Sequence, residues 1–274
     1  IKLNQFDTAK QVIEEGKKQG VDGEILSPLE TQILSISQQE GSAGSIPTEM
    51  QMTSLLAHYE AGRFGDAEQL ALTMTGQFPG HPFGWKVLGA VLGQLGKTDE
   101  ALHANQQAVK LTPQDANAHH NLSVILLELC SFEEAEASSR QAIALKMDFA
   151  LPRHNLGITL HKLYRLGEAK ASFCQAVALK PDYAEAYNNM GITLRELGKL
   201  SRAEASFGRA LVSKIQYTEA HSNLGVTLRE LGRLEEAEAS YRRALALSPN
   251  DAEAMLNLSI VSNYMNKTES EIYS

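Results

Sequence analysis

A column of asparagines is the clearest candidate for chemistry in this chain. Asparagine recurs every 34 residues through five consecutive segments, at Asn121, Asn155, Asn189, Asn223 and Asn257. An amide side chain offers two donors and one acceptor, so a row of them could bind the backbone of an extended peptide without requiring a particular sequence. Alternatively, these amides bond within the helix stack and fix the geometry between neighbouring units. Asparagine is intrinsically unfavourable in the middle of a helix, so either role needs a structural reason.

Two further polar columns accompany the asparagines. One residue earlier stand His120, His154, Asn188 and Ser222, and six residues later stand His161, Arg195 and Arg229. Arginine binds carboxylates well, so Arg195 and Arg229 could hold acidic groups of a partner. The alternative is a solvated face, because Glu196 and Glu230 follow them directly. The predicted peptide-binding site therefore combines the asparagine column with His120, His154, Asn188, Arg195 and Arg229.

The other motifs do not indicate catalysis. His119 and His120 would point about 100° apart on a helix, and no cysteine or carboxylate completes a metal-ligand spacing. The chain has no nucleophile elbow, no phosphate-binding glycine loop and no Cys–His signature. We predict no catalytic residues, no metal and no cofactor, and thus a chain that is not itself an enzyme.

Composition limits the partners and the compartment. The net charge of −8 argues against binding to a nucleic-acid backbone. No apolar run approaches the roughly 20 residues that span a bilayer, and the N-terminal residues do not resemble a secretory signal. Cys130 and Cys174 suggest no disulfide framework, so we expect two small buried thiols and a cytoplasmic location.

The 34-residue spacing extends to many other positions. A small residue recurs at Gly89, Ser123, Gly157, Gly191, Gly225 and Ser259, and alanine recurs at Ala67, Ala101, Ala135, Ala169, Ala203 and Ala237. A fixed period of this length predicts a stacked array, in which each unit buries its apolar face against its neighbours. Six full units are predicted, at 48–81, 82–115, 116–149, 150–183, 184–217 and 218–251.

Each unit is predicted to contain two helices. In the unit 184–217 they cover 184–197 and 200–213, and Gly198 forms the turn because glycine accepts a left-handed backbone. Cys130 and Tyr164 replace this glycine in two units, so we expect other geometry there. Small residues in the two columns should let the helices of one unit approach closely.

The ends of the chain depart from the regular array. Residues 1–20 match the second helix of an incomplete upstream repeat, which suggests a fragment of a longer protein. Residues 21–47 are predicted to form a short helix followed by a flexible, Gly/Ser-rich connection. Residues 252–274 form a partial repeat or a capping helix.

The units resemble tetratricopeptide repeats. The resemblance is carried by the Leu-Gly pair, the downstream alanine, the aromatic residue, the second alanine and the closing proline of each unit. In the unit 82–115 these residues are Leu88-Gly89, Ala101, Ala108 and Pro113. Asn105 stands there in place of the aromatic residue. The segment beginning at Ala184 also resembles the arrays of O-linked N-acetylglucosamine transferases and of bacterial repeat proteins. The resemblance implies an all-α, right-handed superhelical solenoid of antiparallel helix pairs.

The resemblance also implies a function. Arrays of this kind bind proteins, and in the similar transferases an asparagine ladder holds peptide chains. The leading hypothesis is a scaffold that binds an extended polypeptide in the concave groove. Two alternatives remain: a substrate-docking arm of a larger glycosyltransferase- or sulfotransferase-type enzyme, and an array that self-associates through its terminal repeats. Similarity between the units is typical of bacterial arrays.

Overall fold

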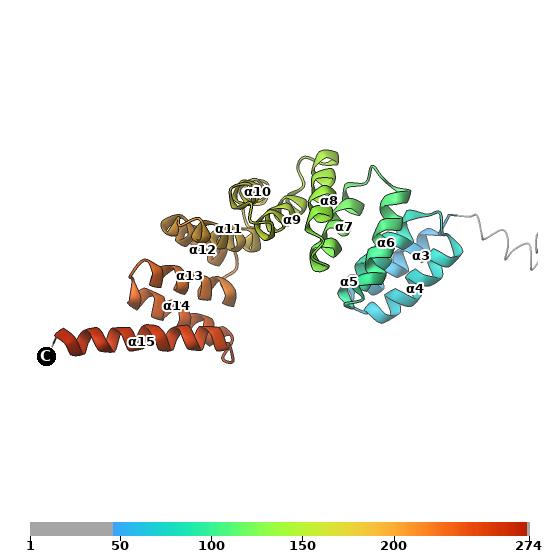
Figure 1. The fold of residues 1–274 in the computed structure, drawn as a ribbon. Helices are drawn as coiled ribbons and strands as arrows, with labels where there is room; N and C mark the ends of the chain where they lie inside the picture. The colour runs from blue at the N-terminus through green and yellow to red at the C-terminus, as the bar shows by residue number, and fades with distance from the viewer. Residues whose placement is uncertain (1–45, 273–274) are drawn as a thin grey trace, which may run out of the picture. The chain divides into compact units, whose positions relative to one another are not determined.

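The computed structural model describes residues 46–272, with side chains up to residue 265. This part of the chain contains α-helices and no strands (Figure 1). It divides after Leu111 into two compact bodies, which are treated separately below. The predicted segment 1–20, nearly all of the predicted segment 21–47, and the last two residues lie outside the described residues.

The N-terminal body contains two helix pairs. These helices are α3 (Glu49–Glu60), α4 (Phe64–Gln77), α5 (Pro82–Gln94) and α6 (Thr98–Leu111). A capping box starts α3: the Thr48 side chain accepts from the Gln51 backbone N–H, and the Gln51 side chain accepts from the Thr48 N–H.

The C-terminal body contains four helix pairs and one final helix. They are α7 (Ala116–Glu128) with α8 (Phe132–Leu145), α9 (Ala150–Lys162) with α10 (Leu166–Leu179), α11 (Ala184–Glu196) with α12 (Leu200–Ser213), α13 (Thr218–Glu230) with α14 (Leu234–Leu247), and α15 (Ala252–Ile272). The bounds predicted for α11 and α12 agree with the structure to within one residue. No helix among the described residues combines the length and apolarity needed to cross a membrane.

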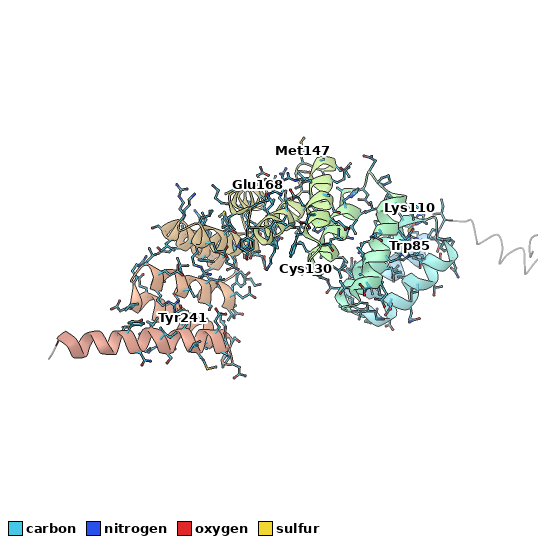
Figure 2. The ribbon with its side chains drawn as sticks, in the orientation of Figure 1. Trp85, Lys110, Cys130, Met147, Glu168 and Tyr241 are labelled. Carbon is cyan, nitrogen blue, oxygen red and sulfur yellow. The ribbon has the colours of Figure 1, made fainter. Side chains whose placement is uncertain are left out.

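Turns within the helix pairs all use a left-handed residue. Gly62, Gly96, Gly198 and Gly232 have φ between 69° and 77°. Cys130 and Tyr164 adopt the same conformation, with φ of 57° and 58°, so the expectation of different geometry at these two turns is wrong. Figure 2 marks Cys130 at the turn between α7 and α8. Because a side chain disfavours this backbone region, the two turns carry local strain that the glycine turns avoid.

Glycine should relieve that strain. We expect Cys130→Gly and Tyr164→Gly each to raise the free energy of unfolding by about 0.5–1 kcal/mol, since the gain in the turn exceeds the added chain entropy of the unfolded state. Tyr164 is 86% exposed, so its removal sacrifices little packing. Urea unfolding would measure the change, and a lowered midpoint in both variants would contradict the strain.

The small columns allow the helices of each pair to approach closely. A Cβ atom added to Gly157, Gly191 or Gly225 would lie 2.5–2.7 Å from Phe173, Phe207 or Tyr241 on the second helix of the pair. These three aromatic rings are 0–1% exposed and form the centre of the core clusters. The glycines are thus required by the rings that pack on them.

The alanine column fills the same contact from the other helix. Ala203 on α12 is fully buried, whereas Ala205, two residues later on the same helix, is exposed. We expect Ala203→Trp to lower the free energy of unfolding by at least about 1–3 kcal/mol through overpacking. Ala205→Trp serves as the matched control; equal urea midpoints for both variants would show that the alignment of the columns is misplaced.

The cysteines differ from expectation. Cys130 and Cys174 are both free and exposed, so the prediction of buried thiols is wrong. Cys130 is exposed because it occupies the turn position, and Cys174 lies on the solvent side of α10, with Sγ 3.6 Å from the sulfur of Met190.

Candidate functional site

The first helices of the C-terminal body form the inner side of the array. Contacts join the first helices of successive repeats, α7 to α9, α9 to α11, α11 to α13 and α13 to α15. Among the described helices of this body, the Cα atoms of successive second helices do not come within 8 Å, and Arg140 on α8 reaches Glu168 on α10 only through its side chain, at 3.7 Å. The row of first helices is therefore the shorter side of the curve, and we call its solvent-facing surface the inner face.

The asparagine ladder, Asn121 to Asn257, lies along the contacts between successive first helices. Nδ2 of Asn155 donates to Ser123 Oγ at 3.2 Å and lies 3.4 Å from His120 Nδ1. Nδ2 of Asn189 lies 2.9 Å from His154 Nε2. Each of these amides therefore bonds to the repeat before it.

The pattern continues toward the C-terminus with different partners. Asn223 donates through Nδ2 to Asn188 Oδ1 at 3.1 Å, and Asn257 accepts through Oδ1 from Arg229 at 3.0 Å. Asn155 is 8% exposed, and the other ladder residues are half-buried. For Asn155, Asn189 and Asn223, these bonds use the NH2 end of the amide, while Oδ1 takes no part in them. The ladder thus joins neighbouring repeats through the NH2 groups of these three amides.

His154 is one of the buried polar residues of the predicted site, and Asn188, at 2% exposed, is buried more deeply. His154 is 8% exposed, its Nδ1 lies 3.0 Å from the Tyr183 hydroxyl, and its ring stacks at a tilt between Phe173 and Tyr183. Because Asn189 donates to Nε2, the neutral ring carries its proton on Nδ1. Burial lowers the pKa of His154 to about 4, against an opposing effect of Glu185.

His120 has a similar environment one repeat earlier. Its ring lies 5.3 Å from that of Phe149, and burial lowers its pKa to about 4. Three first helices are preceded by an aromatic residue, and a lysine Nζ lies over each of these rings at 4.6–5.2 Å from the ring centre. The pairs are Lys146 over Phe149, Lys180 over Tyr183 and Lys214 over Tyr217. The predicted histidine column therefore packs between repeats and is only partly available to a ligand.

The basic column stays at the surface of the inner face. His161, Arg195 and Arg229 are half-buried, and His161 Nε2 lies 3.1 Å from a Glu196 carboxylate oxygen. The histidine therefore has a carboxylate neighbour, whereas no carboxylate of the described chain lies within 4 Å of either arginine.

A column of aliphatic residues on the inner face was missed by the sequence analysis. Three residues after each ladder asparagine stands a half-buried, β-branched aliphatic residue, at Val124, Ile158, Ile192, Val226 and Ile260. The same 34-residue spacing could have revealed it. Ile158 and Ile192 line an inner-face cavity of about 350 Å³, together with Asn189, His161, Lys162 and the ring of Phe173.

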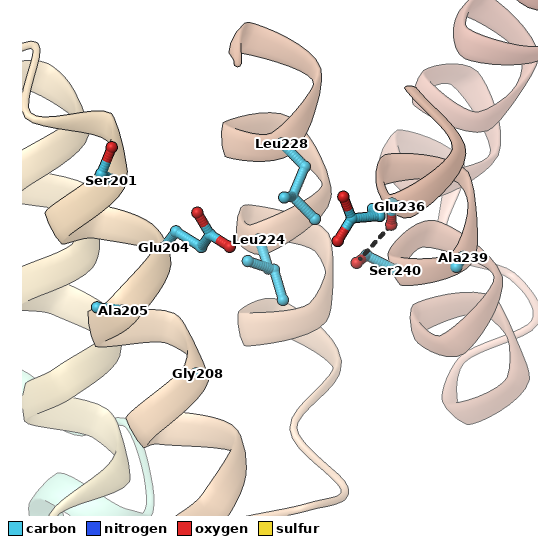
Figure 3. Close-up of a pocket in the computed structure, with 9 residues that line it drawn as sticks. All are labelled: Ser201, Glu204, Ala205, Gly208, Leu224, Leu228, Glu236, Ala239 and Ser240. Carbon is cyan, nitrogen blue, oxygen red and sulfur yellow. Dashed lines mark hydrogen bonds between the residues drawn. The ribbon is translucent and has the colours of Figure 1, made fainter. Parts of the chain in front are cut away.

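The outer side of the array also has hollows, between second helices that diverge. One of them, about 540 Å³, lies over Leu224 and Leu228 between α12 and α14 (Figure 3). Its walls are small residues, including Ala205, Gly208 and Ala239. Its acidic residues Glu204 and Glu236 both accept hydrogen bonds from Arg233, so the outer hollow carries no unpaired charge of its own.

The histidines do not form a metal site. His119 bonds through Nε2 to the Pro113 carbonyl at 3.0 Å, while His120 contacts Asn155 on the next repeat. Within residues 46–265, no three histidine, cysteine or acidic side chains come together as metal ligands would.

Helix pairs stacked at a 34-residue spacing, with a polar and aliphatic inner face, define an α-solenoid protein that interacts with other proteins. The tetratricopeptide repeat model matches residues 87–148, 155–217 and 188–252. The chain belongs to the tetratricopeptide repeat family. No curated protein matches it.

Solved structures share the fold at low sequence identity. The APC/C hetero-tetramer Cut9–Hcn1 is 17% identical with a TM-score of 0.71, over 77% of this chain and 42% of that one. PilW, a type IV pilus biogenesis factor, is 19% identical with a TM-score of 0.70, over 76% of this chain and 97% of that one. YrrB, described as having an unusual peptide-binding site, is 20% identical with a TM-score of 0.54, over 68% of this chain and 95% of that one.

Proposed function

We propose that the protein is an interaction scaffold whose inner face, along α7 to α15, holds an extended polypeptide. The observation that carries this proposal is the pairing of two parallel columns on one surface. The asparagine ladder runs beside the aliphatic column through five successive repeats. An extended chain presents side chains and backbone groups at regular intervals, so it matches a surface with both features.

The ladder has two roles in this proposal. Its NH2 groups hold neighbouring repeats together, as the contacts of Asn155, Asn189 and Asn223 show. Its carbonyl oxygens are then the groups that accept from backbone N–H groups of the ligand. The cavity beside Ile158 and Ile192 takes an apolar side chain of the same ligand. YrrB, a structural neighbour with a described peptide-binding site, supports this use of the fold.

The test compares two faces of one protein. The parent chain, a ladder variant (Asn155→Ala/Asn189→Ala/Asn223→Ala) and an outer-face variant (Ala205→Arg/Ala239→Arg) would be used to isolate partners from lysate of the source cell. Circular dichroism would first confirm that each variant folds. We expect the ladder variant to lose a partner that the outer-face variant retains. Loss in the outer-face variant alone would place the binding surface on the second helices.

Because Asn→Ala also removes bonds between repeats, a second inner-face variant is needed. Ile158→Arg/Ile192→Arg leaves the ladder intact and fills the inner-face cavity with two charged side chains. Loss of the partner in this variant supports the groove, and retention of the partner contradicts it. A docking arm of a larger enzyme and self-association both stay predictions, as do the cytoplasmic location and the bacterial origin.

A further inference from the structure

Two of the half-buried arginines of the described chain bond to pairs of carboxylates, and the other half-buried arginines do not. Arg165 bonds to Glu136 and Glu168, and Arg233 bonds to Glu204 and Glu236. Arg153 donates to the Gln175 side chain and to the Met147 carbonyl. Arg195 and Arg229, on the inner face, likewise have no carboxylate partner within 4 Å among the described residues, although the chain carries a net charge of −8. Arg229 has only a neutral acceptor, Asn257 Oδ1.

A buried hydroxyl without a hydrogen-bond partner among the described residues lies in the same region. Tyr241 on α14 (Figure 2) is fully buried, and its hydroxyl has no hydrogen-bond partner among the described residues. Two earlier repeats have Phe173 and Phe207 at this position, where no polar group needs a partner. Arg229 and Arg195 are close enough that their charges lower the pKa of Tyr241, although burial raises it by more. Buried polar groups in proteins are nearly always bonded, so the unpaired Tyr241 hydroxyl distinguishes this repeat from the two before it.

Carboxylates lie near the two arginines without pairing with them among the described residues, and, besides burial, the charges of Glu230 and Glu253 raise the pKa of Tyr241. Glu196, next to Arg195, extends toward His161 of the preceding repeat. Glu230 follows Arg229 by one residue and therefore points about 100° away on the helix. Glu185, at the other end of α11, is neutralised by Lys214 at 3.3 Å. Between the arginines and the ladder stand Ile192 and Val226, which offer an apolar contact.

We propose that Arg195 and Arg229 bind the carboxylates of an acidic polypeptide segment lying extended along the inner face. This inference rests on the proposed function, because it names the kind of chain that the groove takes. Packed helices lie about 8–10 Å apart, and a chain extended in the polyproline II conformation advances about 3.1 Å per residue and brings every third side chain to the same side. Successive first helices are therefore matched by residues about three apart, so the ligand carries acidic side chains at positions i and i+3.

The experiment uses three 15-residue peptides with blocked termini and a fluorescent label. Each contains five copies of serine–valine–X, where X is glutamate, glutamine or lysine. Fluorescence anisotropy with the full chain would measure each dissociation constant at about 50 mM and 500 mM salt. We expect the glutamate peptide to bind at least ~10-fold more tightly than the glutamine peptide at low salt, the factor for one charge-assisted hydrogen bond. The difference should shrink at high salt through screening.

Paired variants assign the preference to the two arginines. Arg195→Ala/Arg229→Ala should bind the glutamate and glutamine peptides equally. Arg202→Ala/Arg209→Ala removes the same charge from exposed positions of α12 and should retain the preference. A parent chain without preference, or a preference that survives in the Arg195/Arg229 variant, overturns the carboxylate site.

The same data separate this failure from failure of the groove. One outcome is that the parent chain binds the glutamate and glutamine peptides with equal affinity, and the Ile158→Arg/Ile192→Arg variant binds neither. This outcome would leave the groove proposal intact and reject the acidic ligand. Absence of binding by all three peptides would overturn both.

Discussion

Substituting alanine for Gly191 will destabilise the protein, whereas the same substitution at Gly208, 17 residues away, will stabilise it. The added Cβ at residue 191 would lie 2.6 Å from the Phe207 ring, and that ring is fully buried and cannot retreat. Relief requires the two helices of the repeat to separate, so we expect a loss of about 2–3 kcal/mol in the free energy of unfolding.

Gly208 provides a closely matched control. It also lies inside a helix, but a Cβ there meets no atom within 4 Å. Alanine should raise the free energy of unfolding by about 0.5–1 kcal/mol, because it restricts the unfolded chain and favours helix. Urea denaturation of both variants would measure the difference, and a change of the same sign in both would refute the close approach of α11 and α12.

Acid should weaken the array through its two buried histidines. His120 and His154 have a pKa of about 4 in the folded protein, because burial disfavours the charged ring, against 6.5 for the exposed group. As the pH falls below 6.5, the unfolded chain binds protons that the folded chain does not. The free energy of unfolding therefore decreases between pH 6.5 and 4, by up to roughly 3 kcal/mol for each histidine. Protonation also removes the acceptor of Asn189 at His154 Nε2.

The array itself supplies the variant that isolates this effect. The next repeat has Asn188 in the histidine column, where it accepts from Asn223. We expect His120→Asn/His154→Asn to be less sensitive to acid than the parent, while carboxylates contribute equally to both. Thermal unfolding at pH 7, 6, 5 and 4.5 would record the two profiles. Parallel profiles would show that the histidines do not titrate with folding.

The repeating part of the fold could be predicted from the sequence because packing recurs every 34 residues. The small column predicted a close approach of paired helices, and the distances from Gly157, Gly191 and Gly225 to the facing rings confirm it. The expectation of a different backbone geometry at two turns was wrong. Left-handed geometry is retained at Cys130 and Tyr164, since helix ends on both sides fix the turn more strongly than the residue type does.

The candidate site was only partly predictable. The 34-residue spacing located the asparagine ladder. It did not predict the hydrogen-bond partners of Asn155 and Asn189, because these depend on which end of each amide faces the preceding repeat. Sequence periodicity contains no such information. The aliphatic column beginning at Val124 was available from the same periodicity and was overlooked, because β-branched residues in a helix are usually attributed to the core. The division of the array after Leu111 has no signal in the spacing of the repeats.

The most direct test of an extended ligand is to identify, by cross-linking, which ligand residue lies beside each repeat. A photo-reactive amino acid would replace Ile158, Ile192 or Val226, one repeat apart on the inner face, and Ala239 on the outer face as control. Mass spectrometry would identify the cross-linked residue of the bound polypeptide in each case. The account predicts cross-links from the three inner positions only, to sites that advance by about three residues per repeat. Cross-links from Ala239, or the same ligand residue reached from all three inner positions, would contradict a polypeptide extended along the inner face.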